Sequence, residues 1–186
     1  MAKPVKQTDA DDIVVRARVE AAALSQLYEL YYERIFRFCV HRLFSKETAE
    51  DVTSTVFLEV ARRIHSFGGR TELDFRNWLY AIAANQANAY IRKASRRKRL
   101  LAEAANSTTD VTTGKSSEPD WPRLYTAILK LRQEHQTIIT LRFFENMEYE
   151  QIAKILDVRG TTLRVTVHRI LDKLRKYLEN VFEGEL

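Results

Sequence analysis

The stretch "QIAKILDVRGTTLRVTVHR", residues 151–169, contains two apolar helical patterns that meet across a short turn. The first pattern places its apolar side chains at Tyr149, Ile152, Ala153 and Leu156. The turn is "DVRG", where Gly160 is free to adopt a positive φ, and Thr161 can then cap the second helix. The apolar residues of the second pattern fall within one arc at 100° per residue: Leu163, Val167, Ile170, Leu171, Leu174 and Leu178. The stretch therefore predicts two helices packed through one shared face.

The second helix carries hydroxyls and cations outside its apolar arc. The candidate residues are Thr161, Thr162, Arg164, Val165, Thr166, His168, Arg169 and Lys173. Arginine can pair bidentately with guanine, threonine can reach a base edge or a phosphate, and an exposed valine can touch a thymine methyl. A helix that is merely solvated has little reason to place a β-branched apolar residue at position 165. The pair is thus typical of a helix-turn-helix that reads a major groove. The alternative is an ordinary antiparallel pair with a solvated cationic face.

A second basic feature is "YIRKASRRKR", residues 90–99. Residues 91–100 carry six basic and no acidic side chains, whereas residues 1–90 carry 12 of each. The run continues a helix predicted to begin near Phe75, but the apolar stripe of that helix stops at Tyr90, so the run is expected to project beyond the core. If all six cations contacted phosphates, log K would fall with log salt at a slope of about −5. A solvated charge run is the alternative.

Polar and aromatic side chains precede this run on the same helix. Asn85, Asn88, Arg92 and Arg99 lie on one stripe beside the apolar one, and amides and guanidinium groups in a row can pair with base edges and phosphates. Trp78 lies in the apolar stripe and is expected in the core. Tyr80 lies off that stripe and is the better candidate for stacking on unpaired bases.

The chain has five glycines and three prolines in 186 residues, which favours long helices over strands and turns. Residues 103–120 are rich in Ser, Thr, Asp and Gly and lack large apolar side chains, so they cannot bury enough surface to fold alone. We therefore predict an all-α protein with two helical domains, at residues 1–102 and 121–186, joined by a flexible linker at 103–120. The helix-turn-helix lies in the C-terminal domain.

Several classes of function find no support in the sequence. Nucleotide-binding glycine loops, H-E-x-x-H, C-x-x-C and G-x-S-x-G are absent, and the four histidines are scattered. The single cysteine, Cys39, excludes an internal disulfide and a thiolate metal cluster. No secretory h-region or membrane-length apolar run occurs. We therefore expect a cytoplasmic protein that is not an enzyme, with no cofactor, no metal site and no membrane partner.

Taken together, these segments resemble the extracytoplasmic-function (ECF) sigma factors of bacterial RNA polymerase, over about residues 12–180. "AEDVTSTVFLEVARRIHSF" is similar to the family's "AEDLVQETFLRAW", and "FRNWLYAIAANQANAYIRKASRRKR" to "WLRRIARNLAIDLLRRRRR". "LSQLYELYYERIFRFCVHRL" resembles the first long helix of sigma domain two, and residues 131–175 resemble domain four. The order and spacing of these segments carry the resemblance, not any single motif.

The resemblance implies partners and residue roles. Domain two would bind the clamp helices of the largest polymerase subunit and melt the minus-ten element; domain four would bind the polymerase flap and read the minus-thirty-five element. The implied polymerase contacts are Asp51, Thr55, Phe57 and Glu59. The implied minus-ten contacts are Asn85, Asn88, Arg92, Lys93, Arg96 and Arg97. We add Tyr80 to this set because it lies off the apolar stripe of the same helix. An anti-sigma protein is a further possible partner.

The chain departs from the family pattern at three places. At the start of the helix-turn-helix, Glu148 stands where a capping Ser is common, so we expect that helix to lack this N-cap. Ser54 and Thr55 stand where the family motif has Gln and Glu. In the family's "GTVKSRLHRA" the Gly, Ser and Arg become Thr161, Val165 and Thr166, which implies an unusual minus-thirty-five sequence. Two other functions stay open at this point: a two-domain DNA-binding repressor that never touches polymerase, and a helical scaffold with an incidental basic segment.

Overall fold

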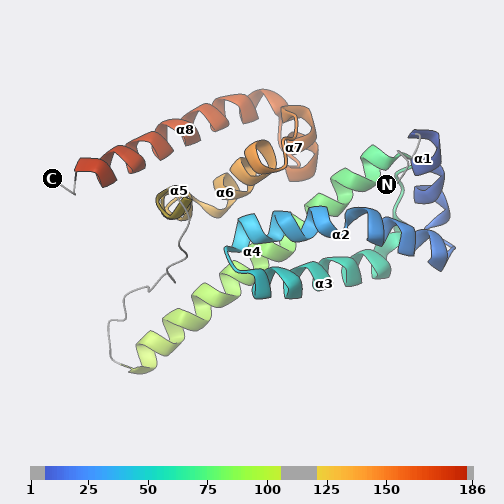
Figure 1. Ribbon diagram of the computed structural model, residues 1–186, viewed down its shortest axis with the longest axis horizontal. Helices are drawn as coiled ribbons and strands as arrows, with labels where there is room; N and C mark the ends of the chain where they lie inside the picture. The colour runs from blue at the N-terminus through green and yellow to red at the C-terminus, as the bar shows by residue number, and fades with distance from the viewer. Residues whose placement is uncertain (1–6, 106–120, 184–186) are drawn as a thin grey trace.

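The computed structural model describes residues 7–105 and 121–183, and every regular element in these two ranges is a helix (Figure 1). The N-terminal module contains α1 (Gln7–Arg16), α2 (Ala21–Leu43), α3 (Lys46–Arg63), the short 3-10 helix η1 (Ile64–Ser66) and α4 (Glu72–Ala105). The C-terminal module contains α5 (Trp121–Leu129), α6 (Gln133–Ile139), the π-helical turn η2 (Thr140–Phe144), α7 (Tyr149–Leu156) and α8 (Gly160–Glu183). The prediction of an all-α protein with two helical domains is confirmed.

The N-terminal module is a bundle in which α2 packs against α3 and both pack against α4. Its core comes from residues spaced three and four apart, such as Tyr31, Ile35 and Phe38 on α2. The backbone N–H of Thr48 donates to Ser45 Oγ at 3.3 Å, so Ser45 caps α3. This bundle fixes the direction of α4.

Helix α4 is 34 residues long and is buried only over its first half. It begins at Glu72, three residues before the predicted start, because the Asp74 carboxylate accepts the N–H groups of Arg70 and Thr71 at 3.1 Å each. Among the α4 side chains that the structure describes, the last fully buried one is Ala87, and the distal half of the helix projects past the bundle (Figure 1). The helix also runs to Ala105, past the predicted linker start at 103. The rest of the predicted linker, 106–120, lies outside the described residues.

The helix-turn-helix is present as α7 and α8, but its turn differs from the prediction. Asp157 adopts the left-handed conformation, with a φ of 53°, and no described glycine has a positive φ. Gly160 instead begins α8, so Thr161 lies inside the helix and does not cap it. A short polar side chain tolerates this conformation better than most, which is why the turn does not require glycine at 160.

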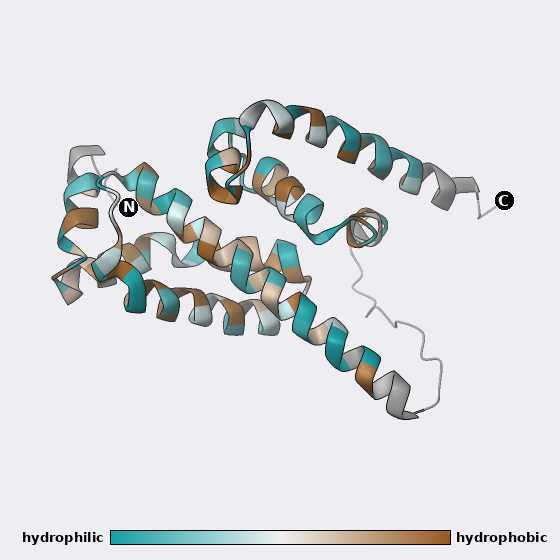
Figure 2. Cartoon of the chain, turned by 180° about the vertical axis from the view of Figure 1, so that it is seen from behind, coloured by the Kyte–Doolittle hydropathy of each residue, from teal (hydrophilic) through white to brown (hydrophobic). Residues whose placement is uncertain are grey.

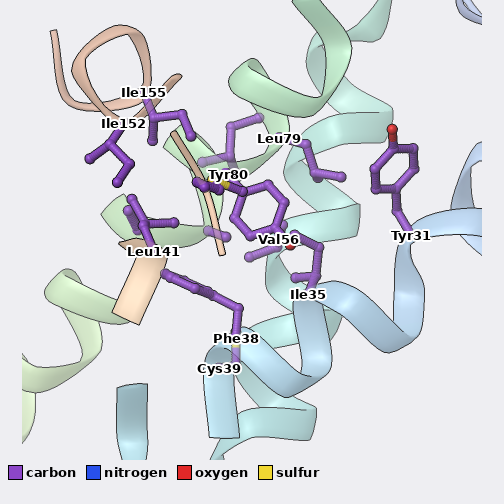
Figure 3. Close-up of a cluster of buried hydrophobic side chains, with 14 of the residues drawn as sticks. Tyr31, Ile35, Phe38, Cys39, Val56, Leu79, Tyr80, Leu141, Ile152 and Ile155 are labelled. Carbon is purple, nitrogen blue, oxygen red and sulfur yellow. The ribbon is translucent and has the colours of Figure 1, made fainter. Parts of the chain in front are cut away.

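The two modules pack against each other through α2 and α4 on one side and η2 and α7 on the other. Figure 3 shows Leu141, Ile152 and Ile155 of the C-terminal module in one cluster with Phe38, Cys39 and Tyr80 of the N-terminal module. The apolar core is therefore continuous across the two modules. Among the described residues, no helix is long and apolar enough to cross a membrane.

Cys39 is fully buried in this core, and burial raises the pKa of its thiol to about 11. Above the unfolded pKa of about 9 the unfolded chain loses this proton while the folded chain keeps it, so the free energy of unfolding falls as pH rises toward 11. At pH 10 we expect a loss of about 1 kcal/mol from this group. Urea unfolding at pH 7 and pH 10 measures it, with Cys39→Ala as control. An equal loss in wild type and variant would contradict the assignment.

Candidate nucleic-acid interface

The outward face of α8 is open. Leu163, Val167 and Ile170 are buried, whereas Val165, on the other side of the helix, is 52% exposed. Thr166 is half-buried. Six further candidates are exposed: Thr161, Thr162, Arg164, His168, Arg169 and Lys173. In Figure 2 the apolar residues of α8 gather on the side toward the rest of the module. The predicted reading face is thus available to a ligand along the first half of the helix.

Several side chains on this face have partners within the helix pair. Arg164 donates to Glu150 of α7 at 3.3 Å and lies 5.5 Å from the Tyr149 ring centroid. A backbone hydrogen bond, with a further contribution from Arg164, holds the pKa of Glu150 below its usual value. His168 pairs with Asp172 at 3.1 Å, and the Thr166 hydroxyl donates to the Thr162 carbonyl at 2.9 Å. If Arg164 pairs with a base, it exchanges its hydrogen bond to the exposed Glu150 carboxylate for one to the base.

The distal half of α4 forms a second exposed surface. Arg92, Lys93, Arg96 and Arg97 are all exposed, and Asn85 is exposed about two turns before Arg92. The sequence has no Asp or Glu between Asp74 and Glu103. This run of positive charge on a projecting rod suits a polyanion.

Tyr80 and Asn88 do not join that surface. Tyr80 is 2% exposed, packs edge-on against Phe38 at 5.6 Å, and donates from its hydroxyl to Glu145 Oε2 at 2.6 Å. The prediction of a surface tyrosine at 80 is therefore wrong: the C-terminal module covers the side of α4 that the sequence pattern leaves polar. Asn88 is half-buried, and its side-chain oxygen accepts from Arg42 Nη2 at 2.7 Å.

Three of the four candidate polymerase contacts lie within about 80° of one another around α3, and Phe57 lies on the other side of the helix. Asp51 and Thr55 are exposed one turn apart, and the Thr55 hydroxyl donates to the Asp51 carbonyl at 2.9 Å. Phe57 turns toward α2, where its ring centroid lies 4.8 Å from that of Tyr28. Glu59 lies one turn beyond Thr55, on the same side of α3, and pairs with Arg62 and Arg63.

An aromatic ridge on α2 was missed by sequence reasoning. Tyr28, Tyr32 and Phe36 lie one turn apart, and Tyr32 stacks on Phe36 with centroids 6.2 Å apart. Tyr28 is 45% exposed, and Leu58 on α3 is 52% exposed. The i, i+4, i+8 spacing was visible in the sequence, but only the fold shows that this side faces solvent and adjoins Phe57. Half-exposed aromatic side chains in a row are typical of an interaction surface.

The described residues offer no group of three or more His, Cys, Asp or Glu side chains placed to hold a metal ion. The two open basic surfaces, one on each module, are instead suited to nucleic acid.

Comparison with known proteins identifies the family. The sigma-70 region 2 model matches residues 27–97, and the sigma-70 region 4 model matches residues 122–174. The ECF RNA polymerase sigma-E factor of Haemophilus influenzae is 33% identical over 151 residues, which cover 75% of this chain and 77% of that protein. The chain belongs to the ECF sigma factors. The RNA polymerase sigma factor YlaC of Bacillus subtilis is also similar, with 28% identity over 88% of this chain and 96% of its own length.

Solved structures give the same fold for this sigma factor. CnrH, in complex with the cytosolic domain of CnrY, aligns with a TM-score of 0.67 at 16% identity, over 92% of this chain and 97% of that one. RpoE of Bartonella quintana, in complex with the anti-sigma factor NepR, aligns with a TM-score of 0.61 at 19% identity, over 83% and 96% of the two chains. The region 2 match falls on the module with α4, and the region 4 match contains the helix-turn-helix. The sigma factor is thus a transcription initiation factor, and the repressor alternative is not favoured.

Proposed function

We propose that this sigma factor holds two promoter elements at once, with α4 on the minus-ten element and α8 in the major groove of the minus-thirty-five element. The observation that supports this proposal is the placement of two open basic surfaces on separate modules, each within the region that its family model matches. Lys93 and Arg96 would neutralise phosphates, while Asn85 would hydrogen-bond to a base. Extruding a base costs a few kcal/mol, and these contacts would offset that cost.

On α8, Arg164 and Arg169 flank Val165 and would read or clamp the groove around it. The remaining exposed candidates, Thr161, Thr162, His168 and Lys173, surround them and would contact phosphates and sugars. We propose no catalytic chemistry and no cofactor for this chain, because the work it does is binding and strand separation. Its place of action is that of the polymerase, the cytoplasm.

Core polymerase would bind the N-terminal module through Asp51, Thr55 and Glu59 of α3 together with Phe57 and the aromatic ridge of α2. Charged groups steer the encounter, and the half-exposed aromatic rings supply apolar contact area. By analogy with the RpoE relative, we also propose an anti-sigma protein as a regulatory partner. Binding to the polymerase flap is proposed for the C-terminal module.

Run-off transcription with purified core polymerase tests the proposed function. Promoter-specific initiation is expected when the sigma factor is added to core enzyme. DNA binding without initiation would instead support a repressor, and neither activity would support a scaffold.

Thr55→Glu is expected to strengthen binding to core polymerase. The family motif has Glu at this position, and here the exposed hydroxyl of Thr55 is occupied by the Asp51 carbonyl. An added surface carboxylate opposite a basic partner contributes up to about 1 kcal/mol, or about fivefold in Kd. Fluorescence anisotropy with core enzyme measures this, and Thr55→Gln is the matched neutral control. Equal affinities for the Glu and Gln variants would show that charge at 55 does not contribute to docking.

A further inference from the structure

A cleft of about 480 Å³ lies where the end of α2, the distal half of α4 and the turn between α5 and α6 meet (Figure 1). Small-molecule sites usually have volumes of about 300–1,000 Å³, so this cleft is large enough for one. Six of its lining residues are apolar: Leu43, Phe44, Ile91, Ala94, Leu129 and Leu131. Because α2 and α4 belong to one module and the turn belongs to the other, the cleft has both walls only while the modules are packed.

The apolar wall is partly accessible. Leu129 is 47% exposed, and Tyr90, which also lines the cleft, is 42% exposed. Phe44 ends α2 in the left-handed conformation, with a φ of 55°, which bulky side chains rarely adopt. In that conformation its ring packs edge-on against Tyr125, with centroids 4.6 Å apart. The cleft therefore presents an aromatic ring and exposed apolar surface to a ligand.

Arg42 places a buried cation in the lining of the same cleft. Arg42 is 1% exposed, and its Nη1 donates to Gln136 Oε1 at 2.6 Å while its Nε donates to Thr137 Oγ1 at 3.3 Å. Its Nη2 donates to Asn88 Oδ1 at 2.7 Å and to the Gln133 carbonyl at 3.1 Å. A guanidinium group has five N–H donors, so these bonds leave one N–H of Nη1 without an acceptor among the described residues.

The charge of Arg42 is not neutralised by a carboxylate in the part of the chain that the structure describes. Its acceptors are amide, hydroxyl and carbonyl oxygens, and burial lowers the pKa of its guanidinium to about 10. Arg132 lines the same cleft and is exposed, so a second guanidinium group adds to the positive charge. An anion in the cleft would supply the negative charge that this lining lacks.

The wall on the C-terminal module is held in place by Gln136. Its Nε2 donates to the Leu129 carbonyl at 3.2 Å and to the Leu131 carbonyl at 2.8 Å, while its Oε1 accepts from Arg42. One amide therefore fixes both the α5–α6 turn and the buried guanidinium. A site that is formed before its ligand arrives loses less free energy to ordering on binding.

We propose that this cleft is a binding site for a small organic anion with an apolar, ring-containing body. A carboxylate or sulfonate of the ligand pairs with Arg132 and with the remaining N–H of Arg42, and its rings pack on Phe44, Ile91 and Leu129. The lining includes none of the residues proposed to contact DNA or polymerase, so this proposal goes beyond the proposed function and does not depend on it. A bound ligand stabilises the packed arrangement of the modules by mass action.

Titration of the full chain with 8-anilinonaphthalene-1-sulfonate tests the site. This dye joins an apolar ring system to one sulfonate and fluoresces strongly when it leaves water. N-phenyl-1-naphthylamine has the same rings without the sulfonate and is the matched neutral dye. We expect one sulfonate dye per chain, and a rise of about 3–6 °C in the midpoint of thermal unfolding at a dye concentration of about ten times Kd.

Two variants locate the dye. Ala94 is exposed and lines the cleft, so Ala94→Trp should fill the cleft and abolish binding, whereas Ala22→Trp, at an exposed position of α2 outside it, should not. Arg132→Gln should weaken the sulfonate dye by about fivefold and leave the neutral dye unchanged. Lys130→Gln removes the same charge from an exposed residue that does not line the cleft and is the control.

Several dyes per chain, or full binding to Ala94→Trp, would overturn the proposal. An equal effect of Arg132→Gln on the two dyes, or an equal effect of Lys130→Gln on the sulfonate dye, would overturn the recognition of an anion. Dye affinity that falls as the protein concentration rises would mean that a second copy of the chain occupies the cleft instead. If Ala94→Trp fails to fold, as its circular-dichroism spectrum would show, the two glutamine variants decide the question.

Discussion

Replacing Arg92, Arg96 and Arg97 together with alanine should lower the affinity of the sigma–polymerase complex for promoter DNA by about 10²- to 10³-fold at 0.1 M salt. These three guanidinium groups are exposed on the projecting half of α4. Each phosphate contact releases condensed counterions and contributes about 0.9 to the slope of log K against log salt, somewhat less on single strands. Three lost contacts should therefore reduce that slope by about 2 to 3 units. Stability should hardly change, because the residues lie outside the core.

The measurement is a salt titration of holoenzyme binding to a promoter fragment. A triple arginine-to-lysine variant keeps the charge and is the matched control: it should retain the slope and lose only contacts that require the planar guanidinium fork. If the alanine variant kept the wild-type slope, α4 would not be the phosphate-binding surface. If the lysine variant lost as much affinity as the alanine variant, specific guanidinium contacts and not charge would dominate.

The helices and the open faces were predictable because they depend on local spacing. The apolar arc of α8 follows from residues 163–174 alone, and the same arc places Val165 outward. The projection of α4 follows from the end of its apolar stripe. In each case the neighbours along one helix carry the whole pattern, so no knowledge of the rest of the chain is needed.

The contact between the modules was not predictable in this way. Arg42 lies 94 residues from Gln136, and Tyr80 lies 65 residues from Glu145. An arginine near a helix end and a tyrosine off the apolar stripe both read as surface residues, because nothing local signals the module that covers them. The prediction of a positive φ at Gly160 was wrong for a related reason. Several residues of "DVRG" can adopt a left-handed conformation, and packing of α7 on α8 selects Asp157.

Val165→Glu should abolish the contribution of the minus-thirty-five element while leaving the fold intact. Val165 is 52% exposed and lies across the helix from Leu163 and Val167, which are both 2% exposed, so glutamate costs little packing. In the groove the change removes an apolar contact with the bases and adds a carboxylate near phosphates. Loss of a good base contact costs about 1–3 kcal/mol, and repulsion adds to it, so we expect initiation to fall by about 10- to 100-fold.

The comparison that isolates this effect uses two promoters, one with and one without the upstream element. The variant should lose activity only on the first, because the minus-ten contacts of α4 are unchanged. Leu171→Glu introduces the same charge on α8 at a residue that is 38% exposed but lies 120° away from Val165 around the helix, where it should have little effect on either promoter. Equal losses from the two glutamate variants would mean that α8 binds DNA through charge alone. A Val165→Glu variant as active as wild type would mean that this face of α8 does not enter the groove.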